Sequence, residues 1–181
     1  SDFNYLMDWM GGEVAIGHSY VRGGDMPDVP SEQGGLVGAD FQIANGRYGI
    51  VKIYRGESWN PGLRAPLAEP GIEVNEGDYL LEVNGSPLRA PEEPYKFFEG
   101  TANRQVSIRV GPNPGNEGSR VVTVVPLASE GQLRQREWMD GTRRLVDKLS
   151  GGKLAYVWLP NTSQPGYTNF NRYYFAQQDK E

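Results

Sequence analysis

The 181-residue sequence contains no cysteine, a single histidine and no long apolar run. Without cysteine the chain has no disulfide framework, no thiol nucleophile and no thiolate ligand for zinc. No apolar stretch approaches the roughly 18 residues that a membrane helix requires. The first ten residues also carry acids where a signal peptide would carry bases. We therefore expect a folded chain that needs no cofactor and does not enter a membrane.

An excess of positive charge is also absent, because 23 acidic and 18 basic residues give a net charge of −5 without long blocks of one sign. Nucleic acid and anionic membranes bind basic surfaces, so neither is expected as a partner. The acids Asp25, Asp28 and Glu32 lie close together, but the alternating oxygens and central glycine of a calcium loop are missing. We predict no metal site and interpret this segment as a solvated linker.

Glycine and proline are plentiful, with 24 and 13 residues, which favours short strands and turns over a helical bundle. Apolar patterns predict strands over residues 35–43, 47–54, 78–85, 104–111, 119–127 and 154–160. Asn45-Gly46 predicts a tight hairpin between the first two of these strands. Helices are expected over residues 2–10, 91–100, 133–150 and 168–178, with Gly11-Gly12 and Gly151-Gly152 as stops.

These elements predict an α+β fold class and four segments along the chain. They are an N-terminal helical piece (residues 1–24), a linker (25–33), a β-rich domain (34–127) and the start of an α/β unit (128–181). An aromatic group near the end could suggest a ligand platform, but its helical spacing favours burial. Its members are Tyr167, Phe170, Tyr173, Tyr174 and Phe175.

The most specific pattern is "APLAEPGIEVNEGDYLLEVNG", residues 65–85. It resembles PDZ domains of the bacterial, protease-associated kind, through Gly71, Gly77-Asp78, Leu80-Leu81 and Val83-Asn84-Gly85. The alternative is a well-made turn before an apolar strand. The resemblance implies a PDZ-like β-sandwich or partly open barrel with short helices.

The upstream stretch "GGLVGADF" is similar to the carboxylate-binding loop of that family. The resemblance implies that backbone amides at Gly35, Leu36, Val37 and Gly38 form a nest for the terminal carboxylate of a peptide. The strand that follows would offer an edge on which a peptide adds as a further strand. Its expected residues are Ala39, Asp40, Phe41, Gln42 and Ile43. The alternative is that Gly34-Gly35 only ends the linker.

The order of segments over the entire chain resembles tricorn-like serine proteases, relatives of the carboxy-terminal processing proteases. The resemblance implies that His18, in "AIGHSYV", is the general base and that the nucleophilic serine follows residue 181. Where the family has a serine before this histidine the chain has Gly17, so Ser19 is a candidate orienting group. From the residues alone, a lone histidine after an apolar run is also compatible with a packed or surface residue.

No serine in the sequence lies in a GxSxG elbow, so we expect the chain to be inactive without the rest of its parent polypeptide. The resemblance implies peptides or protein C-termini as partners, a homo-oligomeric parent and a cytoplasmic location, with the periplasm as the alternative. A competing hypothesis is a non-enzymatic scaffold whose PDZ domain binds peptides.

Overall fold

The structure is a computed structural model that describes residues 2–25, 27–29, 32–57 and 59–180. The chain divides into two compact units, Ser1–Glu32 and Gln33–Glu181. None of the helices in the described ranges is long and apolar enough to cross a membrane.

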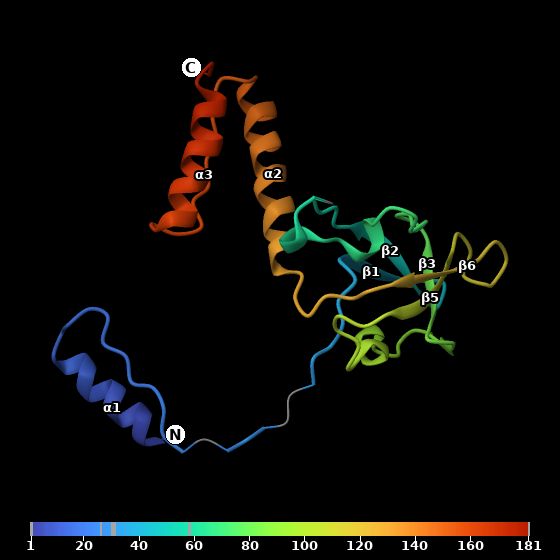
Figure 1. The fold of residues 1–181 in the computed structure, drawn as a ribbon, viewed down its shortest axis with the longest axis horizontal. Helices are drawn as coiled ribbons and strands as arrows, with labels where there is room; N and C mark the ends of the chain where they lie inside the picture. The colour runs from blue at the N-terminus through green and yellow to red at the C-terminus, as the bar shows by residue number, and fades with distance from the viewer. Residues whose placement is uncertain (1, 26, 30–31, 58, 181) are drawn as a thin grey trace. The chain divides into compact units, whose positions relative to one another are not determined.

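The second unit is built on an open antiparallel sheet of six strands (Figure 1). The strand order is β1-β2-β3-β5-β6, and the short β4 pairs with β3. β1 therefore lies at an edge of the sheet. The strands are β1 (Ala39–Ala44), β2 (Arg47–Ile53), β3 (Tyr79–Val83), β4 (Ser86–Pro87), β5 (Val106–Gly111) and β6 (Arg120–Val124).

The hairpin predicted at Asn45-Gly46 is confirmed, because both residues have positive φ (53° and 69°) and β1 pairs with β2 on either side. Alternating side chains of the strands enter one core together with Phe98 and Leu88. Two short 3₁₀ helices pack on this core, η2 (Pro66–Ala68) and η3 (Pro94–Phe98). A third, η1 (Pro61–Leu63), places Leu63 against a smaller cluster of buried residues. The helix expected over residues 91–100 is thus a single short 3₁₀ segment that begins at the second of its two prolines.

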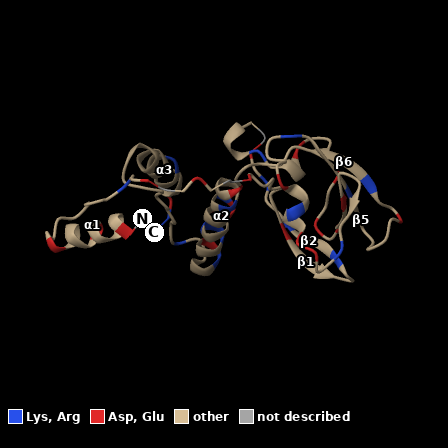
Figure 2. Ribbon diagram, turned by 90° about the horizontal axis from the view of Figure 1, so that it is seen from below, with Lys and Arg blue, Asp and Glu red and all other residues tan. Residues whose placement is uncertain are grey.

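Two longer helices follow the sheet, α2 (Gly131–Ser150) and α3 (Gln164–Tyr174), which continues as η4 (Phe175–Gln177). α2 ends where predicted, at Gly151, which adopts the left-handed conformation with φ 62°. The two helices lie side by side in Figure 1, and Arg136 on α2 donates to the Tyr173 hydroxyl on α3 at 2.7 Å. Acidic and basic residues are interspersed along α2 (Figure 2).

The prediction of a strand over residues 154–160 is wrong, because this segment does not pair with another strand. Its backbone is instead held by a side chain: the amide of Gln177 accepts from Tyr156 N–H at 3.2 Å and donates to Tyr156 C=O at 3.1 Å. A strand needs a neighbouring backbone, whereas the hydrogen bonds given for this segment in the described ranges go to side chains, those of Gln177 and, from Leu154 N–H at 3.0 Å, Ser150 Oγ.

The aromatic residues near the end are buried less than expected. Tyr173 is 7% exposed, but Tyr167 and Phe175 are each more than half exposed. Phe170 and Tyr174 stack on each other, with ring centroids 4.8 Å apart. The prediction of burial therefore holds for Tyr173 and fails for its neighbours.

The first unit contains the helix α1 (Asp2–Glu13). It runs through Gly11 and Gly12, where a stop was expected, and its hydrogen-bonded turns continue to Ala15. None of its residues is buried, and its large apolar side chains are all exposed to solvent within this unit.

Candidate functional site

A groove of about 550 Å³ runs beside the edge strand β1. One wall is β1 with Asp40, Phe41 and Ile43, and the other is the segment from Pro91 to Tyr95. That segment is tied to the sheet because the Tyr48 hydroxyl donates to the Glu92 carbonyl at 2.8 Å. An edge strand offers unpaired backbone groups along one side, so the groove can receive an extended chain.

The loop before β1 carries the four residues expected to bind a carboxylate. Gly35 N–H donates to Phe98 C=O at 2.7 Å, and Leu36 N–H donates to Leu127 C=O at 2.8 Å. Gly38 N–H donates to Oε2 of Glu130 at 2.9 Å. The structure thus brings the loop to the start of the edge strand, with three of its four amides paired inside the chain.

The two loop glycines are required for different reasons. Gly38 has a φ of 74°, a conformation that glycine adopts without strain. A Cβ added to Gly35 would lie 2.2 Å from Thr101 Oγ1 and 2.7 Å from Pro126 Cβ. The small size of Gly35 therefore serves a close approach within the fold.

A charged network surrounds the amide of Gly38. Arg134 donates to Oε1 of Glu130 at 2.7 Å, to Oδ1 of Asp40 at 2.8 Å and to the Tyr54 hydroxyl at 2.8 Å. Its guanidinium also lies over the Tyr54 ring, 4.4 Å from the centroid. The network joins β1, the residue that follows β2 and the first turn of α2, and it reaches the groove at Asp40.

The electrostatics follow from these contacts. Partial burial would raise the pKa of Asp40, but the hydrogen bonds from Arg134 and Tyr54 outweigh it and hold that pKa below its ordinary value. Across the groove, burial and then the negative charge of Glu130 raise the pKa of Tyr95. Tyr95 therefore lies within the field of the same network.

Sequence reasoning missed both Glu130 and Arg134. Their spacing of four residues on a helix indicates a pair. No sequence signal links Glu130 to Gly38, which lies 92 residues earlier in the chain. In the part of the chain that the structure describes, no group of three or more metal-ligating side chains is suitably placed for a metal ion.

His18 lies in the first unit and is exposed. Its backbone has a φ of 66°, and its Nδ1 lies 3.3 Å from the Tyr20 hydroxyl. Ser19 is turned elsewhere, because a Cβ built on Gly11 would lie 3.0 Å from Ser19 Oγ. Position 17 has open space around it, with nothing within 4 Å of a Cβ built there.

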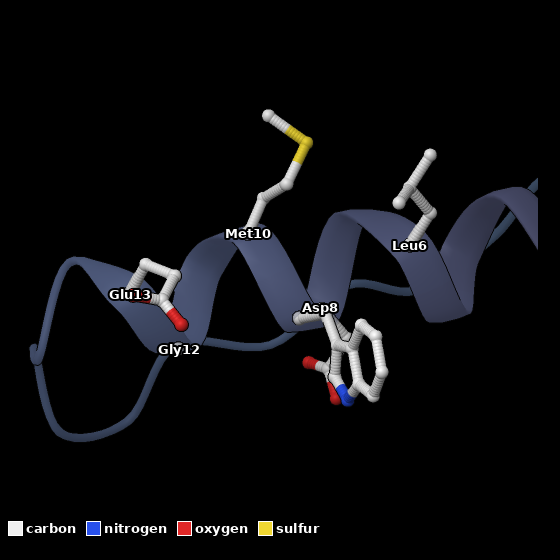
Figure 3. Close-up of a pocket in the computed structure, with 6 residues that line it drawn as sticks. Leu6, Asp8, Met10, Gly12 and Glu13 are labelled. Carbon is white, nitrogen blue, oxygen red and sulfur yellow. The ribbon is translucent and has the colours of Figure 1, made fainter.

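A second hollow follows α1 and is lined by Leu6, Asp8, Trp9, Met10, Gly12 and Glu13. Figure 3 shows Leu6 and Met10, one turn apart, projecting from the same side of the helix, while Asp8 projects from another. All of the lining residues belong to one helix, and His18 is not among them. We therefore do not regard this hollow as a ligand site.

An open antiparallel sheet, a glycine-bearing loop and a groove beside the edge strand define a PDZ-like domain. The chain belongs to the tricorn protease PDZ domain family, which it matches over residues 35–129. This confirms the resemblance of residues 65–85 to PDZ domains.

The similarity extends beyond that domain. Tricorn protease homolog 1 of Streptomyces coelicolor is 35% identical over 164 residues, which are 89% of this chain and 15% of that protein. The Tricorn protease of Thermoplasma volcanium is 26% identical over 179 residues, 99% of this chain and 17% of that protein. The crystal structure of the tricorn protease superposes with a TM-score of 0.77 at 26% identity, over 91% of this chain and 16% of that one. The chain thus spans less than a fifth of these relatives.

Proposed function

We propose that this chain is part of a serine peptidase that hydrolyses peptides through an acyl-enzyme, and that its PDZ domain binds or gates the peptide substrate. The observation that supports this most is the structural match to the tricorn protease over 91% of the chain, which includes segments on both sides of the PDZ domain. A free-standing PDZ module would need no such flanks.

In this proposal His18 is the general base. It would accept the proton of a serine hydroxyl while the serine oxygen bonds to the carbonyl carbon of the substrate, and would then return the proton to the leaving amine. Water would next attack the acyl-enzyme and release the acid. The same imidazole serves as base in the first transfer and as acid in the second, so one histidine suffices for both.

Two features of His18 support this role. Its imidazole is exposed and can therefore meet a serine that comes from elsewhere in the parent polypeptide. Its backbone is held at positive φ, which costs free energy for a residue with a side chain. Strained backbone of this kind is concentrated at functional sites.

The groove beside β1 supports the binding part of the proposal. A peptide added as a further strand would gain main-chain hydrogen bonds from the edge and side-chain contacts from Phe41 and Tyr95. In such binding the main-chain hydrogen bonds supply affinity and the side-chain contacts supply selectivity.

The test uses the parent polypeptide with a fluorophosphonate probe that labels activated serines. We expect labelling of the parent, none of the 181-residue chain alone, and loss of labelling in the parent with His18→Ala. Removing a triad member lowers kcat by a factor on the order of 10⁶ in a well-studied serine protease of another fold. Full peptidase activity with His18→Ala would refute the catalytic role of His18. A parent polypeptide that is not labelled at all would favour the competing hypothesis of a non-enzymatic scaffold.

A further inference from the structure

In the loop before β1, where a PDZ domain would receive a terminal carboxylate, the Gly38 amide is already occupied by a carboxylate of this chain. Oε2 of Glu130 accepts from Gly38 N–H, and the side chain of Glu130 is only 8% exposed. The amides of Gly35 and Leu36 are paired with backbone carbonyls. A peptide terminus would have to displace Glu130 before it reached the Gly38 amide.

The position of Glu130 is not explained by the helix that it precedes. Glu130 is the N-cap residue of α2, where an acceptor side chain usually pairs with the first amides of its own helix. Its carboxylate makes no such bond and is held between Gly38 N–H and the guanidinium of Arg134. An amide and a guanidinium are the kinds of donor that a bound terminal carboxylate would take.

Charge at this end of the groove also disfavours a second anion. The carboxylates of Asp40 and Glu130 share the single guanidinium of Arg134. Lys52, the other cation that acts on Asp40, is paired with Glu137 at 3.5 Å. Glu137 also pairs with Arg144, at 3.3 Å. Beside Arg134 itself, an incoming carboxylate would meet two carboxylates that already share this guanidinium.

The rest of the groove remains open along β1. Ile43 is 55% exposed, Phe41 is half-buried, and both line the groove opposite Tyr95. These apolar surfaces and the free edge suit an extended chain that continues past the loop in both directions.

We propose that the groove along β1 binds an extended internal segment of a peptide or protein, and that Glu130 takes the place of the terminal carboxylate. This rests on the proposed role of the groove in peptide binding. It narrows the ligand class from C-termini to segments without a free carboxyl end.

The test is an NMR titration of the ¹⁵N-labelled 181-residue chain with two pools of randomised hexapeptides. Both pools are acetylated at the N-terminus; one has free carboxyl ends and the other is amidated. We expect both pools to shift the amide signals of β1, with half-saturation concentrations that agree within about twofold.

Two variants sharpen the test. Glu130→Ala removes the resident carboxylate and frees the Gly38 amide and the Nε–H of Arg134, while Arg134 keeps its bond to Asp40. The free-acid pool should then bind this variant at least about tenfold more tightly than the amidated pool does. Glu130→Gln is the matched control, because its amide oxygen still fills the position, and it should show no preference for the free acid.

Three results would contradict the inference that the groove binds an internal segment with Glu130 in place of the terminal carboxylate. A preference of tenfold or more for free acids in the unaltered chain would overturn this inference and leave the groove as a peptide site. No shift of β1 signals with either pool would remove the groove from the proposed function, and the inference with it. A folded Glu130→Ala chain without preference for free acids would overturn the role of Glu130; if that variant does not fold, the unaltered chain decides.

Discussion

The two units of this chain bury their apolar side chains to very different extents. In the unit Gln33–Glu181, strands and short helices enclose a continuous core around Phe98 and Leu80. In the unit Ser1–Glu32, α1 has no buried residue and exposes Phe3 and Trp9. The groove thus lies in a region that completes its own core. The candidate base His18 lies in a region whose apolar helix needs a surface from elsewhere to be covered.

This difference suggests a division of labour. A binding groove depends on an edge strand and a facing segment, and both are held by a core within the same unit. In the proposed function, the base His18 depends on a serine nucleophile that another part of the parent polypeptide would supply. We infer that the groove binds without help, whereas the histidine becomes active only in the assembled protein.

The largest effect should come from emptying the core of the second unit. Phe98 is 1% exposed, so Phe98→Ala should lower the free energy of unfolding by about 3–5 kcal/mol. The matched control is Phe3→Ala on α1, where 68% exposure predicts a change below about 0.5 kcal/mol. Urea denaturation of the 181-residue chain measures both, and similar losses for the two variants would break the comparison.

A smaller loss of stability should follow when a methyl group is added at Gly35, in the loop that resembles a carboxylate-binding loop. Gly35→Ala places a Cβ against Thr101 and Pro126 and should cost about 1–3 kcal/mol through overpacking. The control Gly17→Ala lies in open space in the first unit, so it should not destabilise the chain. Thermal melts of the two variants compare the regions directly. An unchanged melt for Gly35→Ala would mean that the close approach at Gly35 can relax.

The same contrast separates what the sequence predicts from what it leaves open. Alternating apolar residues and Asn45-Gly46 predicted the hairpin of β1 and β2, because local backbone preference and burial on one face point the same way. The end of α2 at Gly151 was also predicted, because the left-handed conformation that ends the helix is a preference of the glycine itself. Such features need only a few neighbouring residues.

The failures involve partners that are distant in sequence. Residues 154–160 are apolar enough for a strand, but pairing needs another backbone, and in the structure the side chain of Gln177 takes that place. The pattern in "GGLVGADF" predicts a loop that approaches something closely. It does not distinguish a ligand from Pro126 at Gly35, or from Glu130 at Gly38.

In the first unit, the test concerns which group orients His18. Tyr20→Phe removes the hydroxyl that lies 3.3 Å from Nδ1, so turnover of the parent polypeptide should fall by about tenfold through misorientation of the imidazole. Ser19→Ala should change turnover little, because Ser19 Oγ is turned toward Gly11. Steady-state kinetics on a peptide substrate measures both variants. A larger loss for Ser19→Ala would return the orienting role to Ser19.

The smallest effect concerns the charge network of the second unit. Arg134 and Tyr54 hold the pKa of Asp40 below its ordinary value of about 3.9, which means that folding favours the ionised carboxylate. The resulting stabilisation is present above the ordinary pKa and is lost as the pH falls through the lower pKa of the folded state. The side chain is 38% exposed, so solvent screens the pair and Asp40→Asn should cost no more than about 1 kcal/mol at pH 7. At pH 3 the free energies of unfolding of Asp40→Asn and of the unaltered chain should differ less than at pH 7. Urea denaturation at the two pH values measures this difference.

Asp28→Asn is the control in the first unit, since Asp28 has no partner among the described residues, and it should alter stability at neither pH. A gap between Asp40→Asn and the unaltered chain that widens as the pH falls would contradict the assigned direction of the pKa shift.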